Sequence, residues 1–366
     1  MEAKRNSRSF IKARFDRLAF AAILALSFLG LLSLAGISGS ESFFFKKQIL
    51  FFFLGLFFLL AVPFFDYRIF RNHSLPSTVF FTAGVFLLLA TLKAAPIRGV
   101  TAWLHLPLGF SFETSEIVKL ALILFLARFF SSKKGSGKTF SIAVSGIWAF
   151  LAMFLVFLQP DLGSALILLF IWLGGVVLFG LTKRQILIAA IALSAVSMVS
   201  SIFLLEPYQK TRIDSFFSGL SGKGQESYNV VQAKIAIGSG GLWGKGFGNG
   251  TQSGYGLLPE SKSDFAVAAL VEQFGLAAFI FILAMYFLIL NRLFLVGMRA
   301  KDNFSKFFIF LFMIYFFSHV IINIGMNLGL LPVTGLPLPF ISYGGSYLIS
   351  LMIGFGIVES IRQRNL

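Results

Sequence analysis

The sequence contains no cysteine and few charged residues, and each shortage excludes a class of protein. A chain without cysteine forms no disulfide, no thiolate metal site and no thiol nucleophile. Charged residues make up 13% of the 366 positions and hydrophobic residues 57%, which is far from the composition of a soluble globular domain. The composition therefore predicts a polytopic membrane protein.

Apolar runs long enough to cross a bilayer recur along the chain. A transmembrane helix needs about 17 to 25 mainly apolar residues, and ten runs are of this kind. They cover 18–37, 48–65, 77–92, 114–130, 140–158, 162–181, 186–205, 264–290, 304–330 and 340–358. We therefore expect an all-α polytopic membrane protein, with about ten transmembrane helices in a single domain over residues 1–366.

The distribution of Lys and Arg predicts the orientation. If the N-terminus is cytoplasmic, 20 of the 31 basic residues but only five of the 15 acidic residues lie on the inner side. This asymmetry predicts that both termini are cytoplasmic and that one large extracytoplasmic loop, about 206–263, joins helices seven and eight. It also assigns the net charge of +16 to the anionic inner leaflet rather than to nucleic acid. No small-residue cleavage site follows the basic start, so the first run is expected to remain as a membrane helix.

Ionisable residues near the outer ends of the runs are the first candidates for a site. Glu116 and Lys119 are three positions apart and share a helix face within the membrane, where such groups are typical of an inward polar cavity. A structural ion pair between helices is the alternative. Asp161 stands in a tight outer turn after Pro160, which suits the first turn of the next helix, and it either caps that helix or joins the cavity of Glu116.

The long outer loop leads into a third acidic candidate. Twelve of the 35 glycines lie between 219 and 256, a density that lets backbone N–H groups approach an anion or a sugar, although any flexible loop shares it. Short amphipathic helices on the membrane surface are plausible in this loop. Asp264 then opens the eighth run, with Glu272 about two turns deeper. An acid at the water edge of a helix has the position of a general base, whereas a simple N-cap is the alternative.

Prolines interrupt the link between the last two runs. Asn323, Pro332, Pro337 and Pro339 would break an isolated helix. Because irregular backbone within a membrane must be shielded by protein, a broken or re-entrant element is expected here.

Three motifs together resemble the SEDS family (shape, elongation, division and sporulation). They are QPDLGSA at 159–165, the block from IAIGSGG through GKG, GTQ and LPE to DF at 235–265, and LLPVTGLPLPFISYGGS at 330–346. NIGM at 323–326 is similar to the elongation members rather than the division members. The resemblance covers essentially the whole chain. It implies an inverting peptidoglycan glycosyltransferase that polymerises lipid II on the outer face of the cytoplasmic membrane.

The resemblance also implies residue roles. The family's catalytic aspartate falls on Asp264 and its intramembrane pair on Glu116 and Lys119, in ETSEIVK where the usual form is QPSEIxK. Departures include Ala102 in place of a common Arg, and Ser261 with Lys262 in place of Arg and His.

The departing diphosphate needs cations, for which Lys119 and Arg212 are candidates. The remaining candidates are Gln252 and Glu272 for substrate or cavity, and a Mg²⁺ or Mn²⁺ ion held by Asp161 or Glu116.

Partners and alternatives follow from the same resemblance. It implies a class B penicillin-binding transpeptidase as partner, within a rod complex that includes MreC and MreD. A division-type polymerase, a lipid II flippase and a scaffold for the transpeptidase are the alternatives. A flippase would also use Glu116 and Lys119, but the polar residues cluster on the outer side and no inverted repeat is evident.

Overall fold

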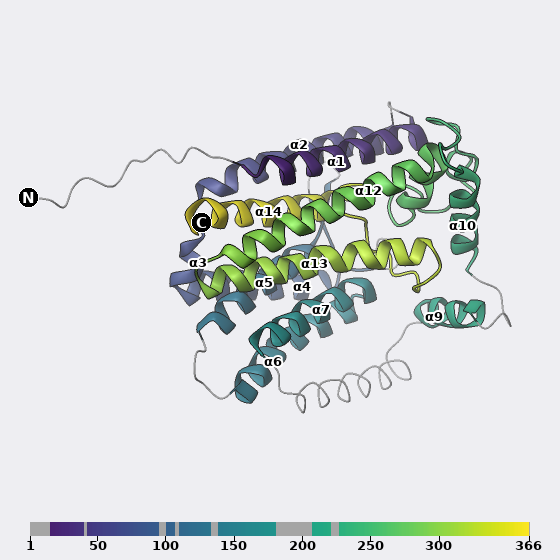
Figure 1. Cartoon of the computed structure of the whole chain (residues 1–366). Helices are drawn as coiled ribbons and strands as arrows, with labels where there is room; N and C mark the ends of the chain where they lie inside the picture. The colour runs from purple at the N-terminus through teal and green to yellow at the C-terminus, as the bar shows by residue number, and fades with distance from the viewer. Residues whose placement is uncertain are drawn as a thin grey trace, which may run out of the picture.

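Helices dominate the computed structural model, which describes residues 15–39, 42–94, 100–106, 110–132, 138–180, 207–220 and 227–365 (Figure 1). Eight helices in these ranges are long and apolar enough to cross a membrane. They are α1 (Arg17–Ser38), α2 (Phe43–Ala61) with the 3₁₀ turn η1 (Val62–Phe64), α4 (Ser74–Thr91), α6 (Lys138–Leu158), α7 (Leu162–Phe179), α12 (Ala266–Arg299), α13 (Asn303–Asn327) and α14 (Gly345–Asn365). The chain is thus a polytopic membrane protein.

The other two predicted runs have different outcomes. The fourth run forms α5 (Thr114–Ser132), a helix whose three charged residues set it apart from the eight apolar ones. The seventh run, 186–205, lies outside the described residues.

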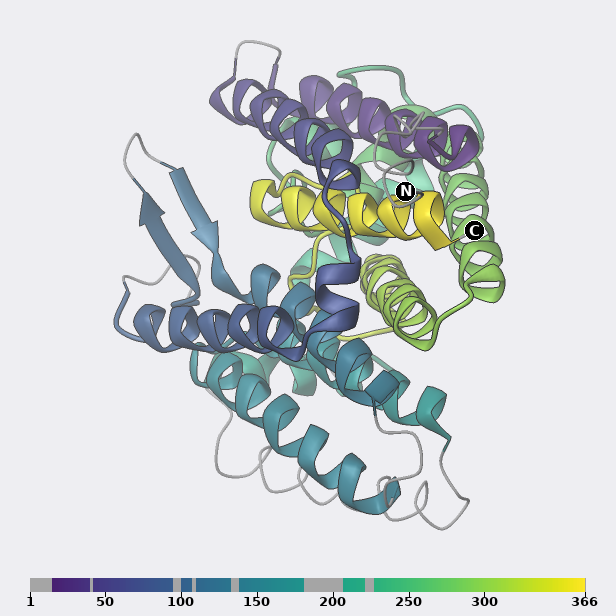
Figure 2. The ribbon, with the colours of Figure 1, turned by 90° about the vertical axis from the view of Figure 1, so that its left-hand side faces the viewer.

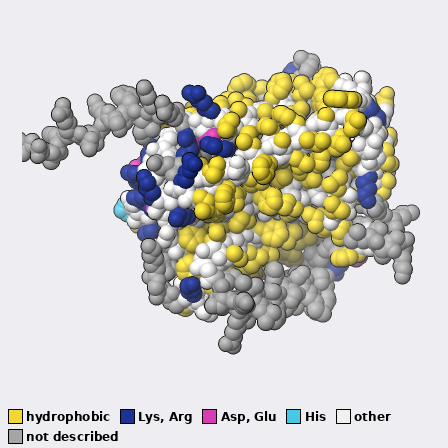
Figure 3. Space-filling model, in the orientation of Figure 1, with side chains coloured by type: hydrophobic (Ala, Val, Ile, Leu, Met, Phe, Trp, Pro, Cys, Tyr) yellow, Lys and Arg dark blue, Asp and Glu magenta, His cyan; other side chains and the backbone are white. Residues whose placement is uncertain are grey.

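The helices run roughly side by side, and α14 lies among them with most of its residues buried (Figure 2). The start of α1 and the end of α14 lie at the same end of the bundle (Figure 1). Basic side chains gather at that end, while apolar side chains cover the middle of the face in view (Figure 3). An apolar middle with a basic end is what a membrane helix bundle requires, because lipid surrounds the middle and charged side chains stay in water.

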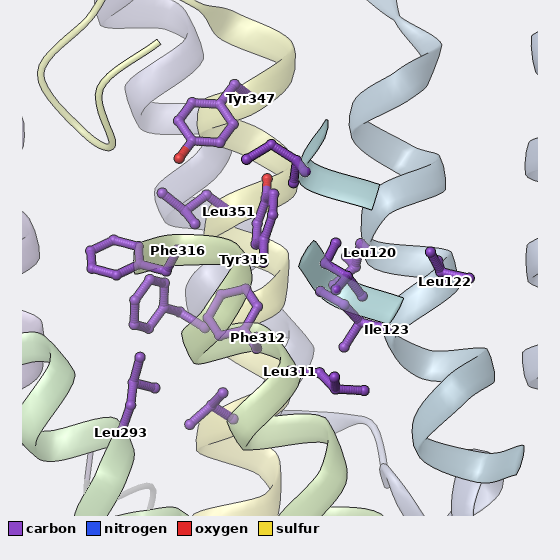
Figure 4. Close-up of a cluster of buried hydrophobic side chains, with 14 of the residues drawn as sticks. Leu120, Leu122, Ile123, Leu293, Leu311, Phe312, Tyr315, Phe316, Tyr347 and Leu351 are labelled. Atoms are coloured by element: carbon purple, nitrogen blue, oxygen red, sulfur yellow. The ribbon is translucent and has the colours of Figure 1, made fainter. Parts of the chain in front are cut away.

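All the described membrane helices contribute to one buried core, and Figure 4 shows the part of it between α5, α12, α13 and α14. Leu120 and Ile123 of α5 lie near Leu311 and Phe312 of α13, and Tyr315 and Tyr347 occupy one end of the cluster (Figure 4). Along α13 the rings of Phe304, Phe308 and Phe312 stack at every fourth residue, with centroids 6.3 and 6.1 Å apart. This spacing stacks their side chains on one face of the helix, which buries large rings against α14.

Polar links between the helices form smaller elements. A hairpin of β1 (Trp103–Leu106) and β2 (Phe110–Glu113) precedes α5, so the expectation of an all-α chain was wrong at this point. The short helix α3 (Arg68–Asn72) joins α2 to α4. In the long loop, α9 (Pro207–Leu220), α10 (Tyr228–Gly240) and α11 (Thr251–Gly254) confirm the expected short helices.

Several boundaries differ from the sequence expectation, and those near the candidate residues are the informative ones. Helix α12 begins at Ala266 and extends to Arg299, with a break at Gly275, whose φ is +77°. Loop backbone fills that break, since Lys245 N donates to Glu272 O at 2.9 Å and Leu276 N donates to Gly241 O at 2.9 Å. Asn323 lies inside α13 instead of breaking it, and the irregular segment is 328–344. Pro160 precedes the N-cap of α7 rather than entering its first turn.

Candidate functional site

Asp264 lies in the turn that precedes α12, and its residue is partly exposed. The N-cap of α12 is Phe265, so the alternative that Asp264 is a simple N-cap was wrong. The carbonyl of Asp264 accepts hydrogen bonds from the Nδ2 atoms of Asn323 and Asn327, each at 3.0 Å. Its carboxylate faces Gly335, where an added Cβ would lie 3.5 Å from Oδ2. Asp264 therefore joins α12, α13 and the segment 328–344.

The same turn is fastened to the start of α14. Ser342 Oγ donates to the carbonyl of Ser263, and Tyr343 N donates to the carbonyl of Lys262 at 2.8 Å. The Lys262 ammonium lies 4.2 Å from the ring centroid of Phe44, near the Tyr343 ring. These contacts border a cavity of about 360 Å³ next to the turn. The carboxylate is thus carried by a backbone anchored on both sides.

Glu116 and Lys119 form a fully buried ion pair, with 2.7 Å between Lys119 Nζ and Glu116 Oε1. Tyr315 of α13 donates to Glu116 Oε2 at 3.1 Å, and Ser350 of α14 donates to the Glu116 carbonyl at 2.9 Å. The structure therefore supports the reading as an ion pair that ties helices together. Tyr315 precedes Asn323 by eight residues, so the pair lies about 12 Å along α13 from the Asp264 carbonyl.

Asp161 caps α7, because its Oδ1 accepts a hydrogen bond from Ser164 N at 2.9 Å. This confirms the capping alternative. The cap also brings Asp161 near a carboxylate that the sequence did not single out. Glu113, the last residue of β2, accepts from Ser115 Oγ at 2.6 Å, and Ser115 in turn contacts Ser164 at 3.3 Å.

Glu113 has an unusual environment for a carboxyl group. Burial, with smaller contributions from the carboxylates of Glu116 and Asp161, raises the pKa of Glu113 to about 8. The raised pKa favours the neutral form of this side chain near pH 7. The usual motif has Gln at this place in the sequence, and a protonated Glu resembles Gln in shape and hydrogen bonding. That match is the signal by which Glu113 was detectable.

Glu272 and Gln252 serve the glycine-rich loop. The Glu272 carboxylate is fully buried and pairs with Lys245 Nζ at 2.8 Å. It also accepts from Thr251 Oγ1, from Gln252 N, and from the N and Oγ of Ser253, at 2.8 to 3.1 Å. These bonds hold the start of α11 against α12, so both candidates contribute loop structure.

Arg212 and the predicted metal site are the remaining candidates. Arg212 is in α9, and its side chain lies outside the described part of the structure. The predicted metal ligands already have other partners, because Asp161 caps α7 and Glu116 binds Lys119 and Tyr315. Within the described residues no cluster of three or more His, Cys, Asp or Glu is arranged for a metal ion. The described residues thus show no ready-made site for a divalent cation, and the cation stays a prediction.

The sequence analysis did not predict Tyr315, Asn323 and Asn327 as site residues. In the run NFSKFFIFLFMIYFFSHVIINIGMN the positions 315, 319, 323 and 327 carry the polar side chains Tyr, His, Asn and Asn. Their spacing of four residues puts them on one face of α13, and all four are buried. That periodicity within an apolar helix was the available signal.

Comparisons with known proteins agree in family. Residues 10–365 match the cell cycle protein family of FtsW, RodA and SpoVE. The peptidoglycan glycosyltransferase MrdB of Escherichia coli is 39% identical over 264 residues, which cover 72% of this chain and 71% of that relative. A probable peptidoglycan glycosyltransferase FtsW of Trichlorobacter lovleyi is 28% identical over 369 residues, covering 97% of this chain and 94% of that relative.

Two solved structures share the fold over nearly their whole length. One is a chain of a peptidoglycan synthase complex, from work on the coordination of polymerization and crosslinking, with a TM-score of 0.78 and 25% identity over 94% of this chain and 96% of that chain. The other is the rod shape determining protein RodA of Thermus thermophilus, with a TM-score of 0.71 and 26% identity over 95% of this chain and 96% of that chain. The chain belongs to the FtsW, RodA and SpoVE family, the SEDS family that its motifs resemble.

Proposed function

We propose that this chain is an elongation-type peptidoglycan glycosyltransferase, which polymerises lipid II on the outer face of the cytoplasmic membrane. The observation that carries the proposal is Asp264, a partly exposed carboxylate whose backbone is fixed by two buried amides. Identity to the glycosyltransferase MrdB supports the reaction class and the elongation branch.

The proposed chemistry is a direct displacement. The Asp264 carboxylate accepts the proton of the acceptor's 4-hydroxyl while that oxygen attacks the anomeric carbon of the donor. The bond from this carbon to the diphosphate oxygen breaks, and the diphosphate leaves with the electron pair. Attack from the opposite face inverts the anomeric configuration. Lys119 and Arg212 are the candidate cations for the leaving group.

Polymer formation from purified lipid II tests the proposal. General-base catalysis contributes about 100- to 10,000-fold, so Asp264→Asn should lose most turnover at equal expression and folding. Asp214→Asn, which changes an exposed acid of α9, is the matched control and should keep wild-type activity. Equal polymer from wild type and Asp264→Asn would move the base elsewhere. Adding a chelator or Mg²⁺ to the same assay tests the predicted divalent cation.

The orientation belongs to the same proposal. We place both termini in the cytoplasm, with ten membrane helices in one domain over 1–366 and residues 206–263 outside. Because the chain has no cysteine, single introduced cysteines report their side cleanly. An impermeant maleimide applied to spheroplasts should label Tyr255→Cys, in an exposed loop position, and should label Lys301→Cys only after lysis. Reversed labelling would invert the topology.

A transpeptidase partner completes the proposal. One structural neighbour is a chain of a complex that coordinates polymerization with crosslinking. We propose that a class B penicillin-binding transpeptidase binds this chain, within an assembly that includes MreC and MreD. Co-purification with the transpeptidase encoded in the same genome is the direct test, and failure to co-purify in mild detergent would contradict it.

A further inference from the structure

One face of α13 connects the buried ion pair to Asp264. Tyr315 donates to Glu116 at 3.1 Å, and His319 Nδ1 lies 3.3 Å from the carbonyl of Pro337. One turn and two turns further along the same face, Asn323 and Asn327 both reach the carbonyl of Asp264. A buried amide is costly unless it is hydrogen-bonded, so these two asparagines are placed for the contacts they make.

Asn327 takes the place of a helical hydrogen bond. If α12 began earlier, Ala268 N would donate to the carbonyl of Asp264, four residues before it. Instead Ala268 N donates to Asn327 Oδ1 at 3.2 Å, and Asn327 Nδ2 donates to the Asp264 carbonyl at 3.0 Å. The side-chain amide satisfies both groups. Asp264 is thereby held outside the helix, which begins two residues later.

Asn323 connects the same carbonyl to the opposite wall. Its Nδ2 donates to Asp264 O at 3.0 Å and to Leu336 O at 2.7 Å. Leu336 follows Gly335, the residue that the Asp264 carboxylate faces. Asn323 therefore fixes the separation between Asp264 and the segment beside its carboxylate. Both asparagine side chains are fully buried, so water does not compete for these bonds.

We infer that Asn323 and Asn327 are positioning residues for glycosyl transfer, which hold the Asp264 carboxylate in its reactive place through its backbone carbonyl. The inference rests on the proposed function, in which Asp264 is the base. A base must be held within a fraction of an ångström, and a displacement of about 1 Å can cost about 100-fold in rate. Neither asparagine contacts the reacting atoms, so neither is a catalytic residue.

Steady-state polymerisation of lipid II by the full chain in detergent, with thermal unfolding measured in parallel, tests this inference. Asn323→Ala and Asn327→Ala should each lower kcat by about 10- to 100-fold and leave KM for lipid II within about twofold. Asn291→Ala, at an exposed position of α12, is the matched control and should match wild type. A merely structural role would lower the amount of folded protein and leave kcat per folded molecule unchanged.

The outcomes separate this inference from the proposed function. Wild-type kcat in both folded alanine variants, or a raised KM with unchanged kcat, overturns the positioning role. If alanine prevents folding, Asn327→Leu keeps most of the side-chain volume but loses both the donor to Asp264 and the acceptor for Ala268, and wild-type kcat in that variant overturns it as well. If Asp264→Asn retains wild-type turnover, the assignment of the base has failed, and the positioning role fails with it.

Discussion

Two buried glutamates, Glu116 and Glu272, are each paired with a lysine but differ in the number of further hydrogen bonds that their carboxylates accept. Glu116 and Glu272 are both almost inaccessible, with lysine ammonium groups at 2.7 and 2.8 Å. Glu272 receives four further hydrogen bonds from the loop around residue 252, and Lys245 is partly exposed. Glu116 receives one further side-chain bond, from Tyr315, and Lys119 is fully buried.

The Glu272–Lys245 pair holds the loop in place and is called the loop clasp below. The Glu116–Lys119 pair, in contrast, has hydrogen-bond donors left over. An ammonium group has three donors, and within the described residues Lys119 uses one of them, towards Glu116. The Glu272 carboxylate is saturated and has no capacity left for a substrate. Burial and a lysine partner therefore do not by themselves mark a site, and the donors that Lys119 has left are what a cation for the leaving group would need.

Breaking the buried Glu116–Lys119 pair should have the largest effect on stability. Lys119→Met leaves a buried carboxylate without its cation, which typically costs about 3 to 5 kcal/mol of unfolding free energy. Thermal unfolding in detergent measures this loss. The double variant Glu116→Gln with Lys119→Met should recover most of the stability, because no uncompensated charge remains. A double variant as unstable as the single one would contradict this account.

Breaking the loop clasp should cost less. In the wild type each Glu272 carboxylate oxygen accepts a backbone N–H, one from Gln252 and the other from Ser253. In Glu272→Gln one of these oxygens becomes an NH₂ group. Either orientation of the amide then sets its NH₂ group against a backbone N–H donor, at a cost of about 1.5 to 3 kcal/mol. Limited proteolysis should detect faster cleavage between 245 and 260, with Asp214→Asn as control. Unchanged cleavage would show that the loop holds without this carboxylate.

The carboxyl group of Glu113 should make stability depend on pH. Its pKa is raised in the folded state from 4.5 to about 8, so the folded state binds more protons than the unfolded state between these values. Stability should therefore fall as pH rises from about 4.5 to 8. Glu113→Gln should flatten this part of the profile and raise the melting temperature at pH 8. An identical slope in the variant would assign the effect to another group.

The smallest effect is expected at the exposed end of the clasp. Lys245→Met removes a partly exposed ammonium, while Glu272 keeps its four other donors. The Glu272 carboxylate itself is fully buried, but its four other donors still satisfy it, so the unfolding free energy should fall by about 1 kcal/mol, the net contribution of one hydrogen bond. A loss as large as that of Lys119→Met would remove the distinction between the two pairs.

Hydropathy and charge were sufficient to predict most of the fold. Eight of the ten expected runs are apolar helices, and α5 was recognised despite Glu116, Lys119 and Arg128. The hairpin β1 and β2 escaped, because strands of four residues carry too short a pattern. The break at Gly275 also escaped, because it depends on hydrogen bonds to loop backbone 27 to 35 residues away in sequence.

The acidic residues of the site were predictable from the sequence, whereas the residues that hold them in place were not. Asp264, Glu116 and Asp161 stand out as charges among apolar residues. The roles of Asn323 and Asn327 depend on which backbone groups lie opposite them, and spacing along one helix does not contain that information. For the same reason the sequence placed Glu272 about two turns deeper than Asp264 but did not predict that its carboxylate faces the loop.

The break at Gly275 also limits which sequences can descend from this one. A Cβ on Gly275 would overlap the nitrogen of Gly244 and the carbonyl of Leu242, and a Cβ on Gly244 would overlap the carbonyl of Gln273. The colliding atoms are backbone atoms that every amino acid has, so a change at one position cannot compensate for a change at the other. Relatives that keep this loop but vary freely at both positions would contradict the argument. Mutation can release these two glycines only by rerouting the loop itself.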